Sequence, residues 1–141
     1  MTCVTESKCI CLIARKSYIW FIPAVLVTAG IAFLSLSEST RVPSVRLNDK
    51  LLHGLMYTAL ALTWLLPLIK SPITDNHSPI TNYAVVLFGT TAYGALLEIL
   101  QHYCTRTRSG DLLDLLADFL GALLGVSIIA LIKWLNNSLT K

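Results

Sequence analysis

Four long apolar stretches limit what this chain of 141 residues can fold into. They run over residues 18–36, 51–69, 83–103 and 112–134, and each is close to the roughly 20 residues that an α-helix needs to cross a bilayer. Because the stretches are continuously apolar and do not alternate with polar residues, they fit helices better than the strands of a membrane barrel. We therefore predict an all-α fold, an integral membrane bundle of four transmembrane helices.

The composition agrees with this prediction. Hydrophobic residues make up 55% of the chain and charged residues only 13%, whereas a soluble domain normally carries about 25% charged residues. This balance argues against a small soluble enzyme and against a disordered tail. The net charge of +3 comes without a dense basic stripe, so we expect the lipid bilayer as a partner and no nucleic acid.

The chain divides into one membrane domain over residues 18–134, an N-terminal tail over 1–17 and a C-terminal tail over 135–141. The connections between the apolar stretches are too short to form a second domain. The first stretch also resembles a cleaved signal peptide, but it is longer than the usual apolar core of about 7–15 residues. We expect it to stay in the membrane as an anchor. Cys9 and Cys11 stand too close together for the usual C-x2-C zinc clip, and the sequence leaves the cofactor unknown.

The distribution of lysine and arginine gives an orientation. With the N-terminus inside, the inner side carries six of these residues and the outer side five. Arg15 and Lys16 adjoin the first stretch, which usually dominates, and the three tryptophans would fall near the inner interface. We predict an inner-membrane protein with both termini in the cytoplasm.

Most polar residues of the membrane domain are expected at one end of the bundle. Successive helices alternate in direction, so the start of the second, the end of the third and the start of the fourth meet at one membrane face, whichever way the chain is inserted. The residues concerned are Asp49, Lys50, His53, Tyr57, Glu98, Gln101, Arg106, Arg108, Asp111, Asp114 and Asp118.

The spacing of these residues places them on shared helix faces. Asp49, His53 and Tyr57 follow one another at intervals of four, and Glu98 and Gln101 are three apart. In the fourth stretch the acidic positions 111, 114 and 118 continue into Gly121 and Gly125. Two glycines at this spacing allow a second helix to approach closely.

Acidic residues within membrane helices are costly and usually mark a functional site. Structural roles compete with that interpretation. The helix dipole favours acids at the start of the fourth helix. His53 could hydrogen-bond between helices, Glu98 could pair with Arg106 or Arg108, and Tyr57 could be an interfacial aromatic.

At these residues the chain resembles the VanZ-like family of small membrane proteins, over about residues 18–134. The resemblance rests on Asp49-Lys50-x-x-His53-x-x-x-Tyr57, on Glu98-x-x-Gln101, and on an Arg108 six residues before Asp114. The family pattern closes with an asparagine and two spaced glycines, where this chain has Asp118, Gly121 and Gly125. The resemblance implies a bacterial inner-membrane protein with a role in the cell envelope, in a family named for a link to resistance against the glycopeptide teicoplanin.

Two functions from different classes follow as hypotheses. In the first, the polar residues bind or modify a phospholipid, a lipid-linked precursor or a cell-wall precursor. The catalytic candidates are His53, Glu98, Asp114 and Asp49, and the ligand-binding candidates are Lys50, Tyr57, Gln101, Arg106, Arg108 and Asp118. Glu98 and Asp114 could instead hold a divalent cation.

In the second hypothesis, the protein is a non-catalytic membrane module. The polar residues then fix the helix packing, and the protein acts through partners. A small transporter ranks last, because the acidic residues gather at one face and do not form a chain across the bilayer. The sequence favours neither an enzyme nor a binding protein, and it does not give an oligomeric state.

Overall fold

The protein is a bundle of α-helices. The computed structural model describes residues 19–36, 46–70, 78–104 and 112–139, of which 46–49, 70 and 104 are described for the backbone alone. Within these ranges there is no strand, and the helices are α2 (Ile22–Leu36), α3 (Arg46–Lys70), α4 (Pro79–Cys104) and α5 (Leu112–Leu139). The predicted all-α bundle of four helices is confirmed.

Three of the four helices are long and apolar enough to cross a membrane. These candidate spans are Lys50–Ile69, Pro79–Tyr103 and Leu112–Leu139. The helix α2 is also apolar, but its 15 residues give a length of about 23 Å at 1.5 Å per residue, which is less than the roughly 30 Å of a bilayer core. The chain is therefore a membrane protein with three full-length candidate spans and one shorter apolar helix.

The helix boundaries differ from those predicted. The helix α3 begins at Arg46 and not at residue 51, α4 begins at Pro79 and not at residue 83, and α5 continues past residue 134 to Leu139. In each case the additional residues are more polar than the apolar stretch beside them. Apolar composition marks the part of a helix that suits lipid, whereas backbone hydrogen bonds extend the helix beyond it.

The start of α4 shows the local reason for one of these differences. Pro79 lies between the predicted stretches 51–69 and 83–103, and it is the first residue of the helix. Its fixed φ suits that position, and the N–H that proline lacks would have had no partner inside the helix. The Ser78 side chain accepts a hydrogen bond from the backbone N–H of Thr81 at 3.3 Å, as a residue that caps a helix does.

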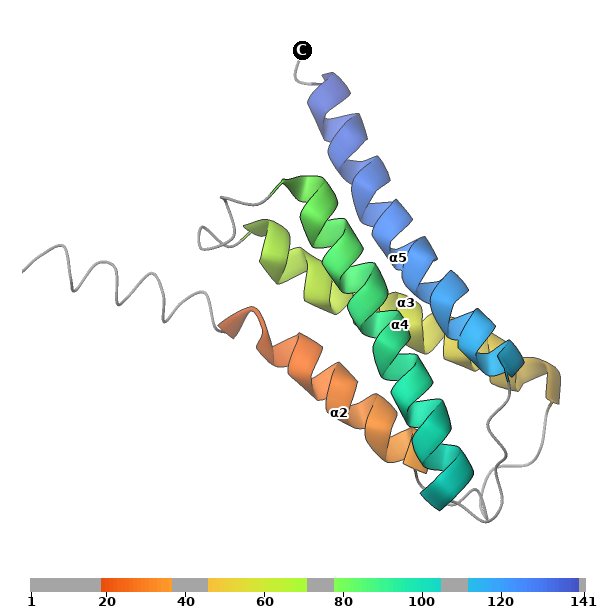
Figure 1. The fold of residues 1–141 in the computed structure, drawn as a ribbon. Coiled ribbons are helices and arrows are strands. Elements are labelled where there is room, and N and C mark those ends of the chain that lie inside the picture. The colour runs from red at the N-terminus through yellow and green to blue at the C-terminus, as the bar shows by residue number, and fades with distance from the viewer. Residues whose placement is uncertain (1–18, 37–45, 71–77, 105–111, 140–141) are drawn as a thin grey trace, which may run out of the picture.

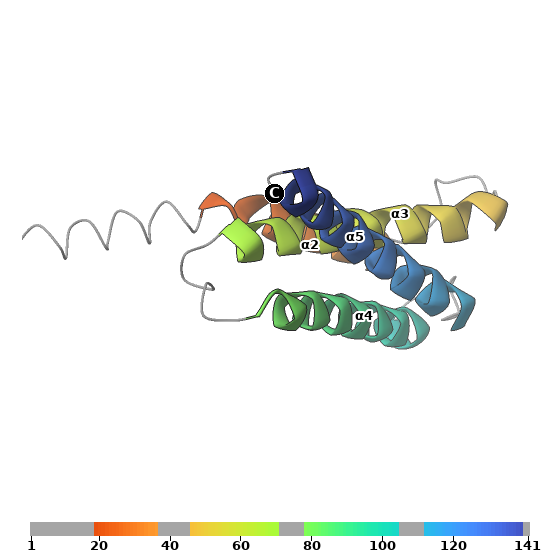
Figure 2. The same ribbon diagram turned by 90° about the horizontal axis from the view of Figure 1, so that it is seen from above.

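The helix ends gather as the alternation of direction requires. The ends of α2 and α4 and the starts of α3 and α5 lie toward one end of the bundle, here called the cluster end (Figure 1). Seen from above, α4 lies to one side of α2 and α3 (Figure 2). The helix α5 runs obliquely, from the level of α4 at its start to that of α3 at its end.

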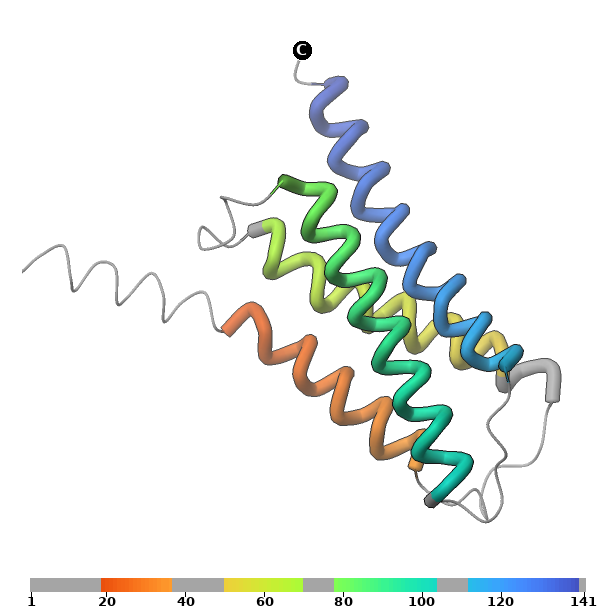
Figure 3. Tube along the Cα trace, viewed as in Figure 1, coloured from red at the N-terminus to blue at the C-terminus, as the bar shows by residue number. Residues whose placement is uncertain are grey.

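The closest helix contact joins α3 to α5, which lie together near the cluster end and diverge toward the other end of the bundle (Figure 3). A Cβ atom built on Gly121 would overlap the Gly54 carbonyl and stand 2.9 Å from the Gly54 Cα atom. One turn further along α5, a Cβ on Gly125 would stand 2.8 Å from the Thr58 carbonyl oxygen. The Thr58 hydroxyl donates a hydrogen bond to the Gly121 carbonyl at 2.9 Å. The predicted role of both glycines in close packing is consistent with these distances.

Polar contacts help to hold α2 against the rest of the bundle. The Trp64 indole donates a hydrogen bond to the Thr28 hydroxyl at 3.0 Å, and the Tyr93 hydroxyl donates one to the Thr28 carbonyl at 2.7 Å. Near the cluster end the Gln101 side chain donates to the Ser35 carbonyl at 2.9 Å. Trp64, which we predicted at the inner membrane interface, thus has its indole N–H satisfied within the bundle.

The outer surface of the bundle is rich in large apolar side chains. Phe33 and Phe88 are more than 70% exposed, and many leucines and isoleucines on all four helices are more than half exposed. The buried residues that pack around the α3–α5 contact are by contrast small or medium-sized, among them Ala61, Ala122 and Val126. Small residues between helices and large apolar ones outside suit a bundle whose solvent is lipid.

The first prediction concerns the α3–α5 contact. Gly121→Ala should lower the free energy of unfolding by about 2 kcal/mol, because the new methyl group would overlap the α3 backbone and force the helices apart. The matched control is Gly89→Ala, since a Cβ built there meets no atom of the described residues within 4 Å. The measurement is unfolding of the purified protein from mixed micelles. Equal stability of the two variants would contradict this packing.

Candidate functional site

One ion pair and one hydrogen-bonded pair join α3 to α5 near the cluster end. The Lys50 ammonium group lies 3.1 Å from an Asp114 carboxylate oxygen, and the His53 Nδ1 atom lies 3.0 Å from an Asp118 carboxylate oxygen. The helices run in the same direction, so a step of three residues on α3 matches a step of four on α5. Four of the predicted site residues are thus brought together in two neighbouring pairs.

The pair of His53 and Asp118 lies deeper in the bundle and is here called the inner pair; its carboxylate is almost completely buried. Asp118 is 1% exposed and Tyr57 is 2% exposed, and the Tyr57 hydroxyl hydrogen-bonds the same carboxylate. A carboxylate can only accept hydrogen bonds. The His53 Nδ1–H and the Tyr57 O–H therefore both donate to Asp118, which fixes the orientation of the imidazole ring.

Gly94 on α4 is a residue of this site that the sequence reasoning missed. A Cβ atom built on it would stand 2.8 Å from the second Asp118 oxygen and 3.2 Å from the Tyr57 hydroxyl. Gly94 therefore leaves the space that the buried carboxylate and the phenol ring occupy. The available signal was its spacing, because Gly94 lies four residues before Glu98 and so one turn away on the same helix face.

Lys50, His53, Asp114 and Asp118 form a polar cluster between α3 and α5, and Glu98 of α4 also belongs to it. One ring nitrogen of His53 and one carboxylate oxygen each of Glu98 and Asp114 lie within 4.8 Å of one another. These residues come from α3, α4 and α5 respectively. Imidazole nitrogen and carboxylate oxygen are ligands that divalent metals accept, so these three residues could hold a metal. The sequence suggested Glu98 and Asp114 for this role, and the structure adds His53 to them.

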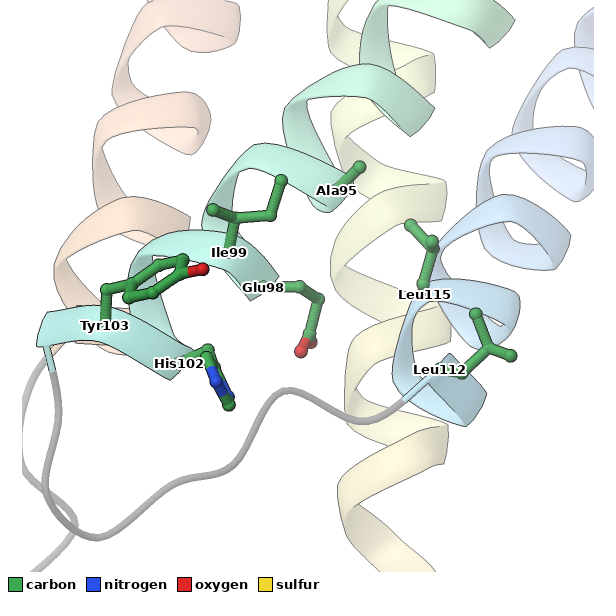
Figure 4. A pocket seen from close by; sticks show the side chains of 7 residues that line it. All are labelled: Ala95, Glu98, Ile99, His102, Tyr103, Leu112 and Leu115. Atoms are coloured by element: carbon green, nitrogen blue, oxygen red, sulfur yellow. The ribbon is translucent and has the colours of Figure 1, made fainter.

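An open pocket of about 370 Å³ adjoins this cluster, between the end of α4 and the start of α5. Its apolar wall consists of Ala95, Ile99, Leu112 and Leu115, and its polar groups come from Glu98, His102 and Tyr103. Figure 4 shows the Glu98 carboxylate and the His102 ring directed toward the space between the two helices. Glu98 thus belongs to both the polar cluster and the pocket.

Gln101 lies apart from the pairs between α3 and α5. It is 4% exposed, and its amide group donates to the Ser35 carbonyl of α2. We predicted it as a ligand-binding residue because it lies three residues after Glu98. Three residues correspond to 300° around a helix, and this offset turns the Gln101 amide toward the neighbouring α2.

Several predicted site residues lie outside the part of the chain that the structure describes. Arg106, Arg108 and Asp111 belong to the segment between α4 and α5, and Asp49 is described for its backbone alone, within α3. The predicted pairing of Glu98 with Arg106 or Arg108 therefore remains a prediction. So does the ligand-binding role of the two arginines.

Comparison with known proteins agrees with the motifs that this geometry assembles. A family model described as VanZ/LLP1 matches residues 16–133. The chain belongs to the VanZ/LLP1 family. No curated protein and no solved structure matches it.

Membership of the VanZ/LLP1 family confirms the resemblance seen in the sequence. The matched range includes all four helices up to residue 133 and every predicted site residue. The position at which this VanZ/LLP1 chain departs from the expected asparagine is the buried Asp118. Its pairing with His53 gives a physical reason why a carboxylate is tolerated there.

The second prediction concerns Asp118, which stands where the family pattern has asparagine. Asp118→Asn should keep the free energy of unfolding within about 1 kcal/mol of wild type, because the amide oxygen can still accept from His53 and the amide NH₂ can donate to the Tyr57 oxygen. Asp118→Leu should cost about 3 kcal/mol, because it leaves the polar groups of His53 and Tyr57 buried without their partner.

Unfolding of both variants in mixed micelles, followed by circular dichroism, makes the comparison. Equal losses in the asparagine and leucine variants would show that hydrogen bonding to residue 118 does not stabilise the bundle. A large loss in the asparagine variant alone would show that the negative charge itself is required.

Proposed function

We propose that this VanZ/LLP1 protein binds an amphipathic ligand, a lipid-linked or cell-wall precursor, at the cluster end of its bundle in the bacterial inner membrane. The observation that carries the proposal is the position of Glu98, which lies beside His53 and Asp114 and also lines the open pocket. A polar cluster and an apolar wall thus share one recess. This is the pairing that a ligand with a polar head and an apolar chain requires.

The walls of the pocket support the apolar part of this ligand. Ile99 and Leu112 are 54% and 79% exposed, so an acyl or prenyl chain against them would cover apolar surface. Burial of such surface is favourable by about 25 cal/mol per Å² when the alternative is water. In a bilayer the gain is smaller, so the polar head must supply the specificity.

The charges of the cluster support recognition of the polar head. Lys50 is the basic residue of the cluster, and its side chain is 43% exposed, so it can reach a phosphate or carboxylate. We propose that Arg106 and Arg108 assist it, because guanidinium groups bind such anions with two parallel hydrogen bonds. His53 can act as an acid or a base if the bound precursor is also modified.

The family supports an envelope role for this ligand. We propose that a precursor held here contributes to the synthesis or remodelling of the cell wall, through which glycopeptide antibiotics such as teicoplanin act. A change in teicoplanin susceptibility on deletion of the gene, restored by wild type and not by Glu98→Gln, is the result expected in cells.

A second function is favoured by the inner pair, His53 with Asp118. Asp118 is 1% exposed and is hydrogen-bonded to His53 and Tyr57, which is the arrangement expected of groups that fix helix packing. On this alternative the protein is a non-catalytic module that acts through partners. It predicts that cluster variants lose stability and function together.

The third prediction tests ligand binding by filling the pocket. Ile99→Trp, from α4, and Leu115→Trp, from α5, should each weaken binding of a polyprenyl phosphate by at least tenfold, because the indole takes the space of the ligand. Phe88→Trp is the control, since Phe88 is 71% exposed and does not line this pocket. Binding is measured by native mass spectrometry of the purified protein, with phosphatidylglycerol as the competing anion.

The outcomes separate the two functions. Loss of binding in both pocket variants, with thermal stability close to that of the Phe88 control, supports the ligand site. Unchanged binding in both variants would end the pocket proposal. Cluster variants such as Glu98→Gln that fall in stability and cellular abundance as much as in function would support the structural module.

The fourth prediction concerns orientation, which we propose to be N-in and C-in, with the apolar stretch over residues 18–36 as the fourth span. A green fluorescent protein fused after Lys141 should fluoresce, and alkaline phosphatase fused within residues 37–45 should be active, because the first protein folds in the cytoplasm and the second on the outer side. An inactive phosphatase fusion together with a dark C-terminal fusion would reverse the orientation. The cluster end would then face the cytoplasm.

A further inference from the structure

We propose that His53, Glu98 and Asp114 form a binding site for one divalent transition-metal ion of the Mn²⁺ or Zn²⁺ type. Their ligand atoms lie within 4.8 Å of one another. They come from three helices, so the fold as a whole brings them together. The proposal goes beyond lipid binding and does not depend on it, because the ion is bound by the protein alone.

The distances come close to those around a common ion. Three ligand atoms that each lie about 2.1 Å from one tetrahedral ion are about 3.4 Å apart. The ligand atoms of His53, Glu98 and Asp114 lie within 4.8 Å of one another. The proposal therefore requires the Glu98 and Asp114 side chains to rotate toward His53 when the ion binds.

The surroundings of His53 match those of a metal-binding histidine. A ligating imidazole commonly donates its other N–H to a carboxylate, which fixes the ring and strengthens the ligand. Here Nδ1 lies 3.0 Å from Asp118, a buried carboxylate that also hydrogen-bonds Tyr57. The Nε2 atom of the same ring is thereby assigned as the metal ligand.

Gly94 supports this arrangement from the side of α4. A side chain at this position would press on the second Asp118 oxygen at 2.8 Å. Because glycine has no side chain, Asp118 has room to contact the Nδ1 atom of His53. Glu98 lies one helical turn beyond Gly94 on α4. One small residue thus makes room for the supporting carboxylate close to the proposed ligands.

Lys50 has a defined part in the proposal, as a competitor for the ion. Its ammonium group lies 3.1 Å from one oxygen of Asp114, which leaves the carboxylate a second oxygen for a metal. The Lys50 side chain is 43% exposed while that of Asp114 is only 18% exposed. An incoming divalent cation would repel the ammonium group, and the long lysine side chain can move into solvent.

The ligand types select the class of ion. One imidazole and two carboxylates suit Mn²⁺, Zn²⁺ or Fe²⁺, whereas Mg²⁺ and Ca²⁺ prefer oxygen ligands alone. Such an ion would also place positive charge beside the pocket. An anionic head could then approach Glu98 without repulsion.

The fifth prediction is tested with Mn²⁺ on the purified full-length protein in detergent, followed by electron paramagnetic resonance. Mn²⁺ is chosen because it binds weakly to thiolates, and the chain has four cysteines. We expect one bound ion per chain, displaced by Zn²⁺. His53→Gln, Glu98→Gln and Asp114→Asn should each weaken binding at least tenfold. His102→Gln, one turn further along α4, should stay within twofold of wild type.

Lys50→Met gives a result in the opposite direction. It removes the competing ammonium group, so it should tighten Mn²⁺ binding severalfold, and this readout does not rely on a variant that fails to fold. The proposal is overturned if the wild type binds no Mn²⁺ at millimolar concentration, if the three ligand variants bind like wild type, or if His102→Gln alone abolishes binding. The pocket variants Ile99→Trp and Leu115→Trp should keep Mn²⁺ binding, which separates failure of the metal site from failure of the lipid site.

Discussion

The close contact between α3 and α5 is the constraint on which the rest of the structure depends. Gly121 and Gly125 leave no side chain between α5 and the α3 backbone, and the Thr58 hydroxyl bridges the two helices. Because both helices start at the cluster end, this contact sets the polar faces of their first turns opposite one another. Lys50 then meets Asp114, and His53 meets Asp118. Without the glycines the helices would stand further apart, and these pairs could not form.

The two residue pairs that join α3 to α5 differ in how far they are buried. The pair of His53 and Asp118 is covered by Tyr57, and Gly94 leaves room for both Asp118 and Tyr57. In the described residues no buried side-chain nitrogen or oxygen lacks a hydrogen-bond partner. The pair of Lys50 and Asp114 is more open, and Glu98 beside it lines a pocket. The inner pair thus has the burial expected of a structural contact, and the outer pair has the exposure that the proposed ligand site requires.

Much of the site could be predicted from the sequence, for a simple geometric reason. The direction of a membrane helix alternates along the chain, so apolar stretches alone place the residues near positions 50, 98 and 114 at one end. Helical periodicity then groups His53 with Tyr57 and Asp114 with Asp118. Neither rule gives the rotation of each helix about its own axis. For that reason the sequence did not reveal that Gln101, three residues after Glu98, donates to Ser35 of α2.

The sequence by itself determined the all-α class, the approximate place of each helix and the end at which the charged residues gather, because these follow from apolar length and period. It predicted the helix ends less accurately, because α3 begins in polar residues before its apolar stretch and α5 ends in polar residues after its own. Only the tertiary structure decided which acid meets which base, that Gly94 makes room for a buried carboxylate, and that His53, Glu98 and Asp114 converge. Those facts depend on how closely three helices pack, and packing distances are set by contacts between residues far apart in the chain.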